Sequence, residues 1–99
     1  MRKSETYLDF CFIQEFTGGL GNKVDKMLDD VFQKQRLKWH LDIKEAEGAE
    51  VVVAEVKGMS SWISEQEVID HLEKEASEDF WTCLQGYQFQ VLPVEKGCS

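Results

Sequence analysis

The spacing of apolar residues switches between a strand period and a helix period along this 99-residue chain. Apolar and polar side chains alternate from Tyr7 to Phe16, which is typical of a β-strand. The glycine-rich stretch from Thr17 to Gly21 interrupts this pattern. From Asn22, a plausible N-cap, apolar residues recur at helical spacing until about Leu37. The sequence therefore predicts a strand followed by a helix.

The middle of the chain predicts a β-hairpin. Apolar and polar residues alternate between Lys38 and Lys44, and a polar turn follows at Glu47 and Gly48. The next stretch, Val51 to Val56, is rich in β-branched residues, which favour strands.

A second helix is predicted to begin after Ser64, because Ser64 and Glu67 have the spacing of a capping box. Its apolar stripe continues to about Leu84, with a separate turn starting at Ser77 as the alternative. Alternation from Tyr87 to Val94 then predicts a last strand.

These elements follow one another in the order β-α-β-β-α-β, which is the ferredoxin-like pattern. The predicted fold is therefore α+β, with a four-stranded antiparallel sheet and two helices on one face. In this topology the first and third strands are central and the other two are edges. The length suits one domain over residues 1–99, with residues 95–99 as a loose tail.

The sheet face turned away from the helices is expected to be apolar along its middle. Its central strands would present Tyr7, Cys11, Ile13, Val51 and Val53 there, whereas the edge strands would present polar residues, namely Lys38, His40, Asp42, Lys44, Gln88 and Gln90. An uncovered apolar stripe usually marks an interface. We therefore expect a homodimer that packs sheet to sheet, as in a dimeric α+β barrel.

Charge is distributed unevenly over the chain. Residues 1–38 contain seven Lys/Arg and six Asp/Glu, whereas residues 39–99 contain four and thirteen, and the whole chain has a net charge of −8. This acidic balance repels phosphate backbones and anionic lipids, so neither nucleic acid nor a membrane surface is an expected partner. No apolar run approaches the roughly 20 residues of a membrane span. Three cysteines without C-x-x-C spacing favour reduced thiols and a cytoplasmic location.

The second predicted helix is strongly acidic. Its candidate partner-binding residues are Glu67, Asp70, Glu73, Glu75 and Glu78. Such a surface is usually only solvated, but it could also dock a basic protein. This alternative describes an acidic inhibitor, such as an immunity protein, an antitoxin or a phage-encoded inhibitor, that masks a basic site.

Motifs for catalysis or cofactor binding are absent from the sequence. His40 and His71 are the two histidines, and neither belongs to a Cys/His cluster, so we expect no metal and no cofactor. The turn from Gly18 to Lys23 fits no phosphate-loop motif, which leaves an anion site there as a minor alternative. For His71, a solvated histidine beside acidic neighbours is the plain interpretation.

The stretch Trp62 to Leu72, followed by Ala76 to Phe80, resembles the antibiotic biosynthesis monooxygenase family of dimeric α+β barrels. The shared features are a Trp that ends the third strand, a small polar residue two positions later and a His on the second helix. The resemblance implies a homodimer with a small-molecule cavity between sheet and helices. It also implies His71 as a general base and Trp62 as a pocket wall, with Trp39 and Trp81 as further ligand-binding candidates.

Two hypotheses of different classes follow. The first is a cytoplasmic homodimer that binds a small aromatic or hydrophobic molecule, in the manner of a cofactor-independent monooxygenase-like protein. The second is the acidic inhibitor. The sequence leaves open whether the chain catalyses any reaction.

Overall fold

The computed structural model describes residues 4–15, 18–33 and 35–93 of the chain. Its elements are β1 (Ser4–Glu15), α1 (Leu20–Phe32), β2 (Arg36–Ala46), β3 (Ala49–Ser60), α2 (Glu65–Glu75), α3 (Glu78–Cys83) and β4 (Leu84–Pro93). The tail predicted at residues 95–99 lies outside the described residues.

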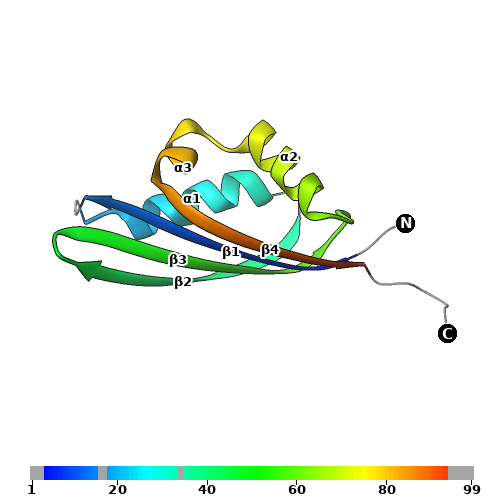
Figure 1. Cartoon of the computed structure of the whole chain (residues 1–99), viewed down its shortest axis with the longest axis horizontal. Helices are drawn as coiled ribbons and strands as arrows, with labels where there is room; N and C mark the ends of the chain where they lie inside the picture. Colours follow the sequence, from blue (N-terminus) through cyan, green and yellow to red (C-terminus); the bar gives the residue numbers. More distant parts are fainter. Residues whose placement is uncertain (1–3, 16–17, 34, 94–99) are drawn as a thin grey trace.

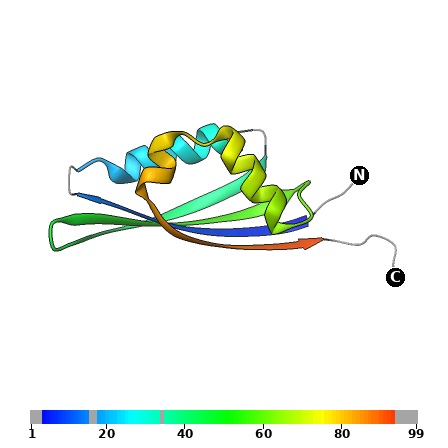
Figure 2. The same cartoon turned by 45° about the horizontal axis from the view of Figure 1, so that its top comes forward.

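All four strands form one antiparallel sheet in the order β2-β3-β1-β4, so β1 and β3 are central and β2 and β4 are edges. The three helices lie together on one face of this sheet (Figure 1). A view turned by 45° shows the same two layers, and no helix of the described chain covers the opposite face (Figure 2). The predicted α+β class and four-stranded antiparallel sheet are therefore confirmed.

The alternation along β1 decides which side chains meet the helices. Leu8, Phe10 and Phe12 are at most 1% exposed and belong to the core between sheet and helices. Buried residues of β3 between Val52 and Val56 are their register partners in the same layer. Side chains at the intervening positions, such as Tyr7, lie on the opposite face of the sheet.

The predicted hairpin is confirmed, with a two-residue turn at Glu47 and Gly48 between β2 and β3. Both turn residues have positive φ, 50° for Glu47 and 79° for Gly48, which is the type I′ geometry that suits the twist of a hairpin. The strands are longer than predicted, because pairing extends back to Arg36, which lies opposite Met59.

The first helix differs from its predicted bounds. It begins at Leu20 instead of following an N-cap at Asn22, because the fully buried Leu20 anchors its first turn in the core. It ends at Phe32 instead of near Leu37, because Leu37 already belongs to β2, where it pairs with Gly58 and is 7% exposed. An apolar residue at this position fits either period, and pairing with β3 decides between them.

The acidic segment forms two separate helices, so the alternative prediction of a separate turn starting at Ser77 is confirmed, and the described chain has three helices instead of two. Ala76 has an extended backbone with ψ of 144°, which ends α2. The hydroxyl of Ser77 then accepts the Phe80 N–H at 3.3 Å and caps α3. Phe80 and Cys83 nevertheless remain on the buried side, so the apolar stripe continues through the break.

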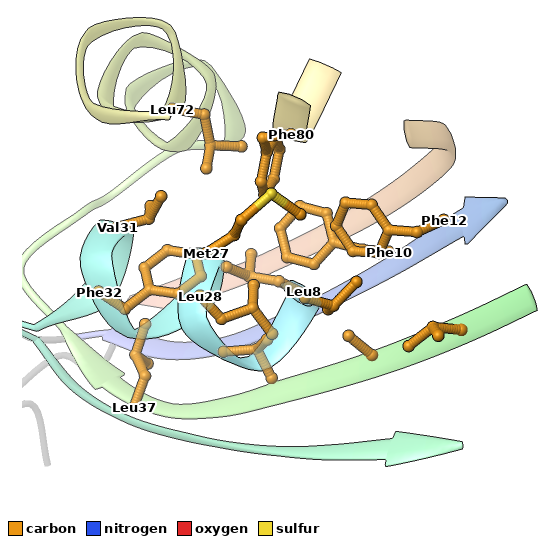
Figure 3. Packing of buried hydrophobic residues seen from close by; sticks show 14 of the residues in the cluster. Leu8, Phe10, Phe12, Met27, Leu28, Val31, Phe32, Leu37, Leu72 and Phe80 are labelled. Carbon is orange, nitrogen blue, oxygen red and sulfur yellow. The ribbon is translucent and has the colours of Figure 1, made fainter. Parts of the chain in front are cut away.

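Aromatic rings connect the sheet to the helices at the centre of the core (Figure 3). The Phe10 ring centroid lies 5.6 Å from that of Phe80 and 5.4 Å from that of Phe89, both in edge-to-face geometry. Phe12 makes a second such contact with Phe80 at 5.2 Å. Pairs of this kind each contribute about 0.5–1.5 kcal/mol beyond the burial of their area. None of the described helices has the length and apolar run that a membrane crossing requires.

Candidate functional site

His71 lies on α2, and its ring is tied to α1. Nε2 lies 2.8 Å from the carbonyl oxygen of Val31. A carbonyl oxygen only accepts, so Nε2 carries a proton and donates it. This carbonyl is among the last four of α1, which lack partners within the helix. His71 therefore caps α1 from the neighbouring helix, and Nδ1 is the nitrogen left for a general base, a role that stays a prediction.

Two of the predicted ligand-binding tryptophans share one aromatic cluster with His71. Its ring centroid lies 5.2 Å from that of Trp62 and 6.2 Å from that of Phe32, on which it stacks. Phe32 also contacts Trp39 at 6.4 Å, and the Trp39 indole donates a 2.9 Å hydrogen bond to Asp25. Trp62 is 7% exposed and Phe32 is 1% exposed. The structure thus brings Trp62, Trp39 and His71 together in one cluster, in which Trp39 and His71 are half-buried.

The structure does not bring Trp81 into this cluster. Trp81 lies on α3, is 38% exposed, and makes its ring contact with the adjacent Phe80 at 5.5 Å. Its ring contact thus differs from those of Trp62, which packs against Phe32 and His71.

Two of the five acids predicted to bind a partner serve α2 itself. The Ser64 hydroxyl accepts the Glu67 N–H at 3.3 Å, so the predicted N-cap at Ser64 is confirmed. Glu67 Oε2 reaches one residue further back than a capping box requires and accepts the Ile63 N–H, also at 3.3 Å. Asp70 accepts a 3.0 Å hydrogen bond from the amide of Gln66. The other three acids are exposed: Glu73, Glu75 and Glu78.

The glycine-rich turn contacts a carboxyl group of the protein itself. The Gly18 N–H donates to Glu50 Oε1 at 3.1 Å, and Glu50 is only 5% exposed on β3. The Gly18 N–H, which an external anion could have bound, therefore already has a hydrogen-bond acceptor in Glu50.

We call the face of the sheet opposite the helices the open face. On it, register partners on neighbouring strands form rows of side chains that run across the sheet. The acidic row consists, from β2 to β4, of His40, Glu55, Asp9 and Gln88. The basic row lies two residues away from the acidic row on each strand. It consists of Lys38, Lys57, Tyr7 and Gln90. All eight residues are exposed. Within the described part of the chain, no salt bridge joins the charges of either row to another residue.

The apolar stripe expected along the middle of the open face is only partly present. One end of the face is apolar, with half-buried side chains of Cys11, Ile13, Val51 and Val53. Towards the other end, Asp9, Glu55 and Lys57 occupy the central strands and interrupt the stripe. The same alternation that exposes the apolar residues also exposes these charges, so the apolar stripe covers only one end of the face.

A hollow of about 480 Å³ opens over the two rows. This volume lies within the roughly 300–1,000 Å³ of typical small-molecule sites. Its lining consists of Tyr7, Asp9, Lys38, Trp39, His40, Glu55, Val56, Lys57 and Gln90. Tyr7 is 40% exposed and supplies aromatic surface. Sequence reasoning placed Tyr7, Lys38 and Gln90 on this face but missed the hollow, because it depends on how four strands align.

Among the described residues, no three His, Cys, Asp or Glu side chains are grouped so as to hold a metal ion. Comparisons with protein-family models and with curated proteins find no match to this chain. The functional assignment therefore depends on the geometry of the open face.

Proposed function

We propose that this protein binds a small aromatic molecule with an anionic group in the hollow of the open face. The observation that carries the proposal is that the exposed Tyr7 lies opposite Lys57, with Lys38 on the next strand, and that all three residues line the hollow. Lys38 and Lys57 lie directly opposite each other on β2 and β3, where like charges repel. An anionic group between them would relieve this repulsion while the aromatic part packs against Tyr7.

The same proposal assigns the chain to the ferredoxin-like folds and to the dimeric α+β barrels. The strand order and the uncovered sheet face support it, as does the resemblance to the antibiotic biosynthesis monooxygenase family. A second copy would cover the hollow and exclude water from the ligand. His71 and Trp62 lie on the helix side of the sheet, so the proposed site differs from the cavity that the resemblance implies, and no catalytic step is proposed. The acidic inhibitor stays a prediction. Two of its five residues, Glu67 and Asp70, already accept hydrogen bonds from residues at or just before the start of α2.

Fluorescence titration with 1-anilinonaphthalene-8-sulfonate, an aromatic sulfonate, tests the site. We expect saturable binding whose dissociation constant rises about tenfold in Tyr7→Ala, because the variant loses its stacking surface. Trp81→Ala is the matched control, since it removes an exposed aromatic side chain from the helix side. Equal affinities of wild type and Tyr7→Ala, or no saturable binding by the wild type, would refute the proposal.

A further inference from the structure

We infer that the second copy packs on the open face about a two-fold axis that crosses the strands between the acidic row and the basic row. This inference rests on the proposed function, in which a second copy covers the hollow. It adds the register of the two sheets and therefore the residues that the second copy contributes to the ligand site.

The geometry of the strands gives the contacts. Successive side chains on one face of a strand lie about 6.6 Å apart, so the two rows are immediate neighbours. A two-fold axis between them, perpendicular to the strands, reverses the strand direction and keeps each strand opposite its counterpart. Lys57 then lies opposite Glu55 of the second copy, and Tyr7 lies opposite Asp9 of the second copy. Symmetry repeats each contact.

Charge selects this axis over the other simple arrangement. An axis parallel to the strands, between β1 and β3, would place Glu55 opposite Asp9 of the second copy. Carboxylates would then oppose carboxylates, which costs affinity. The charges of both rows have no salt bridge within the described chain, so they remain available to a second copy.

The hollow supplies a second reason. Because the residues of both rows line it, the axis passes over its middle, and two hollows would merge into one closed chamber. Each copy would then contribute Tyr7, Lys38 and Lys57 to the same ligand, with Lys57 between the anionic group and Glu55 of the second copy. One row further out, the exposed Leu92 lies opposite Gly86 of the second copy, where a smaller hollow of about 240 Å³ opens.

Charge reversals on β3 test the register, because contacts next to the axis are the least displaced by the roughly 30° angle between packed sheets. Sedimentation equilibrium would compare Lys57→Glu, Glu55→Lys and the double variant with the wild type. Each single reversal should raise the dimer dissociation constant on the order of 100-fold, because a repulsive contact then occurs twice. The double variant should restore association, since opposite charges face each other again. Lys74→Glu and Glu73→Lys on α2 are the matched controls and should leave association unchanged.

The outcomes separate the register from the proposed function. Under the parallel axis, Glu55→Lys would strengthen the dimer, because it would bring a cation opposite Asp9. Such strengthening, or a dimer insensitive to both reversals, would overturn the register while leaving ligand binding by the Tyr7 hollow intact. A wild type that is monomeric at all concentrations would overturn the register and the dimeric part of the function together. Weakening by both single reversals with recovery in the double variant supports the inference.

Discussion

Replacing His71 separates its observed capping contact from its predicted role as a base. His71→Ala removes the 2.8 Å hydrogen bond to the Val31 carbonyl and the ring contacts with Phe32 and Trp62. Leaving a partly buried carbonyl without its donor costs about 1–3 kcal/mol, and each lost ring contact costs about 0.5–1.5 kcal/mol. Because alanine favours the helix more than histidine does, we expect a net loss of about 2–4 kcal/mol in the free energy of unfolding.

Urea unfolding followed by circular dichroism measures this loss in the free energy of unfolding. A second variant separates the hydrogen-bond part of the loss from the ring-contact part. His71→Phe keeps an aromatic ring but has no N–H, so it should lose only the hydrogen-bond part, about 1–3 kcal/mol. Glu73→Ala on the same helix is the control, because Glu73 is exposed. If His71→Ala were as stable as this control, the side chain would not hold α1, and the capping interpretation would be wrong. Unchanged sulfonate binding by the folded His71→Phe would show that the open-face site works without this histidine.

Two backbone predictions concern the β2–β3 hairpin. Gly58→Ala should lower the free energy of unfolding by about 3 kcal/mol or more, because Gly58 has φ of +152° and an added Cβ would overlap the carbonyl oxygen of Arg36. Gly86→Ala, where an added Cβ meets nothing within 4 Å, should stay within about 1 kcal/mol of wild type, and equal urea midpoints for the two variants would contradict the strain argument. Glu47→Asn should raise the free energy of unfolding by about 0.5–1 kcal/mol, because asparagine tolerates the φ of 50°. Glu47→Gln removes the same charge without this tolerance, so a gain equal to that of Glu47→Asn would assign the effect to charge.

Features that depend on neighbouring residues were predictable from the sequence. The cap between Ser64 and Glu67 is made within one helical turn, and the Ser64 hydroxyl accepts the Glu67 N–H as predicted. The turn at Glu47 and Gly48 is equally local, and it appears at the predicted residues. The order of strands and helices follows from periods that need no knowledge of tertiary contacts.

Element ends that depend on distant residues were not predictable in the same way. Leu37 continues the helical period of the preceding segment, but its pairing with Gly58 places it in β2. The apolar stripe after Ala76 left two alternatives, a helix that continues to about Leu84 and a separate turn from Ser77. The structure has the break, after which Phe80 packs against Phe10 and Phe12. Contacts between segments far apart in the sequence override local propensity here.

The candidate site shows the same limit. Alternation assigned Tyr7 and Lys38 to the open face, but their common hollow depends on the register of three strand pairs. At His71 the prediction from helix position was wrong in the other direction, because it indicated a side chain exposed to solvent. Packing of α2 against α1 instead turns its ring towards Phe32 and the end of α1.

The free-energy cost of making room for a ligand differs between the two faces of the sheet. On the helix side, Phe32 and Trp62 fill the space around His71, and displacing large buried side chains costs about 2–5 kcal/mol each. A small domain has only about 5–15 kcal/mol of stability in total, so a cavity there would consume a large share of it. On the open face the hollow already exists beside Tyr7, and its charges face solvent. Ligand binding and self-association should therefore use the same face. A ligand enclosed between two copies should tighten the dimer, because it binds the paired state better than the single chain.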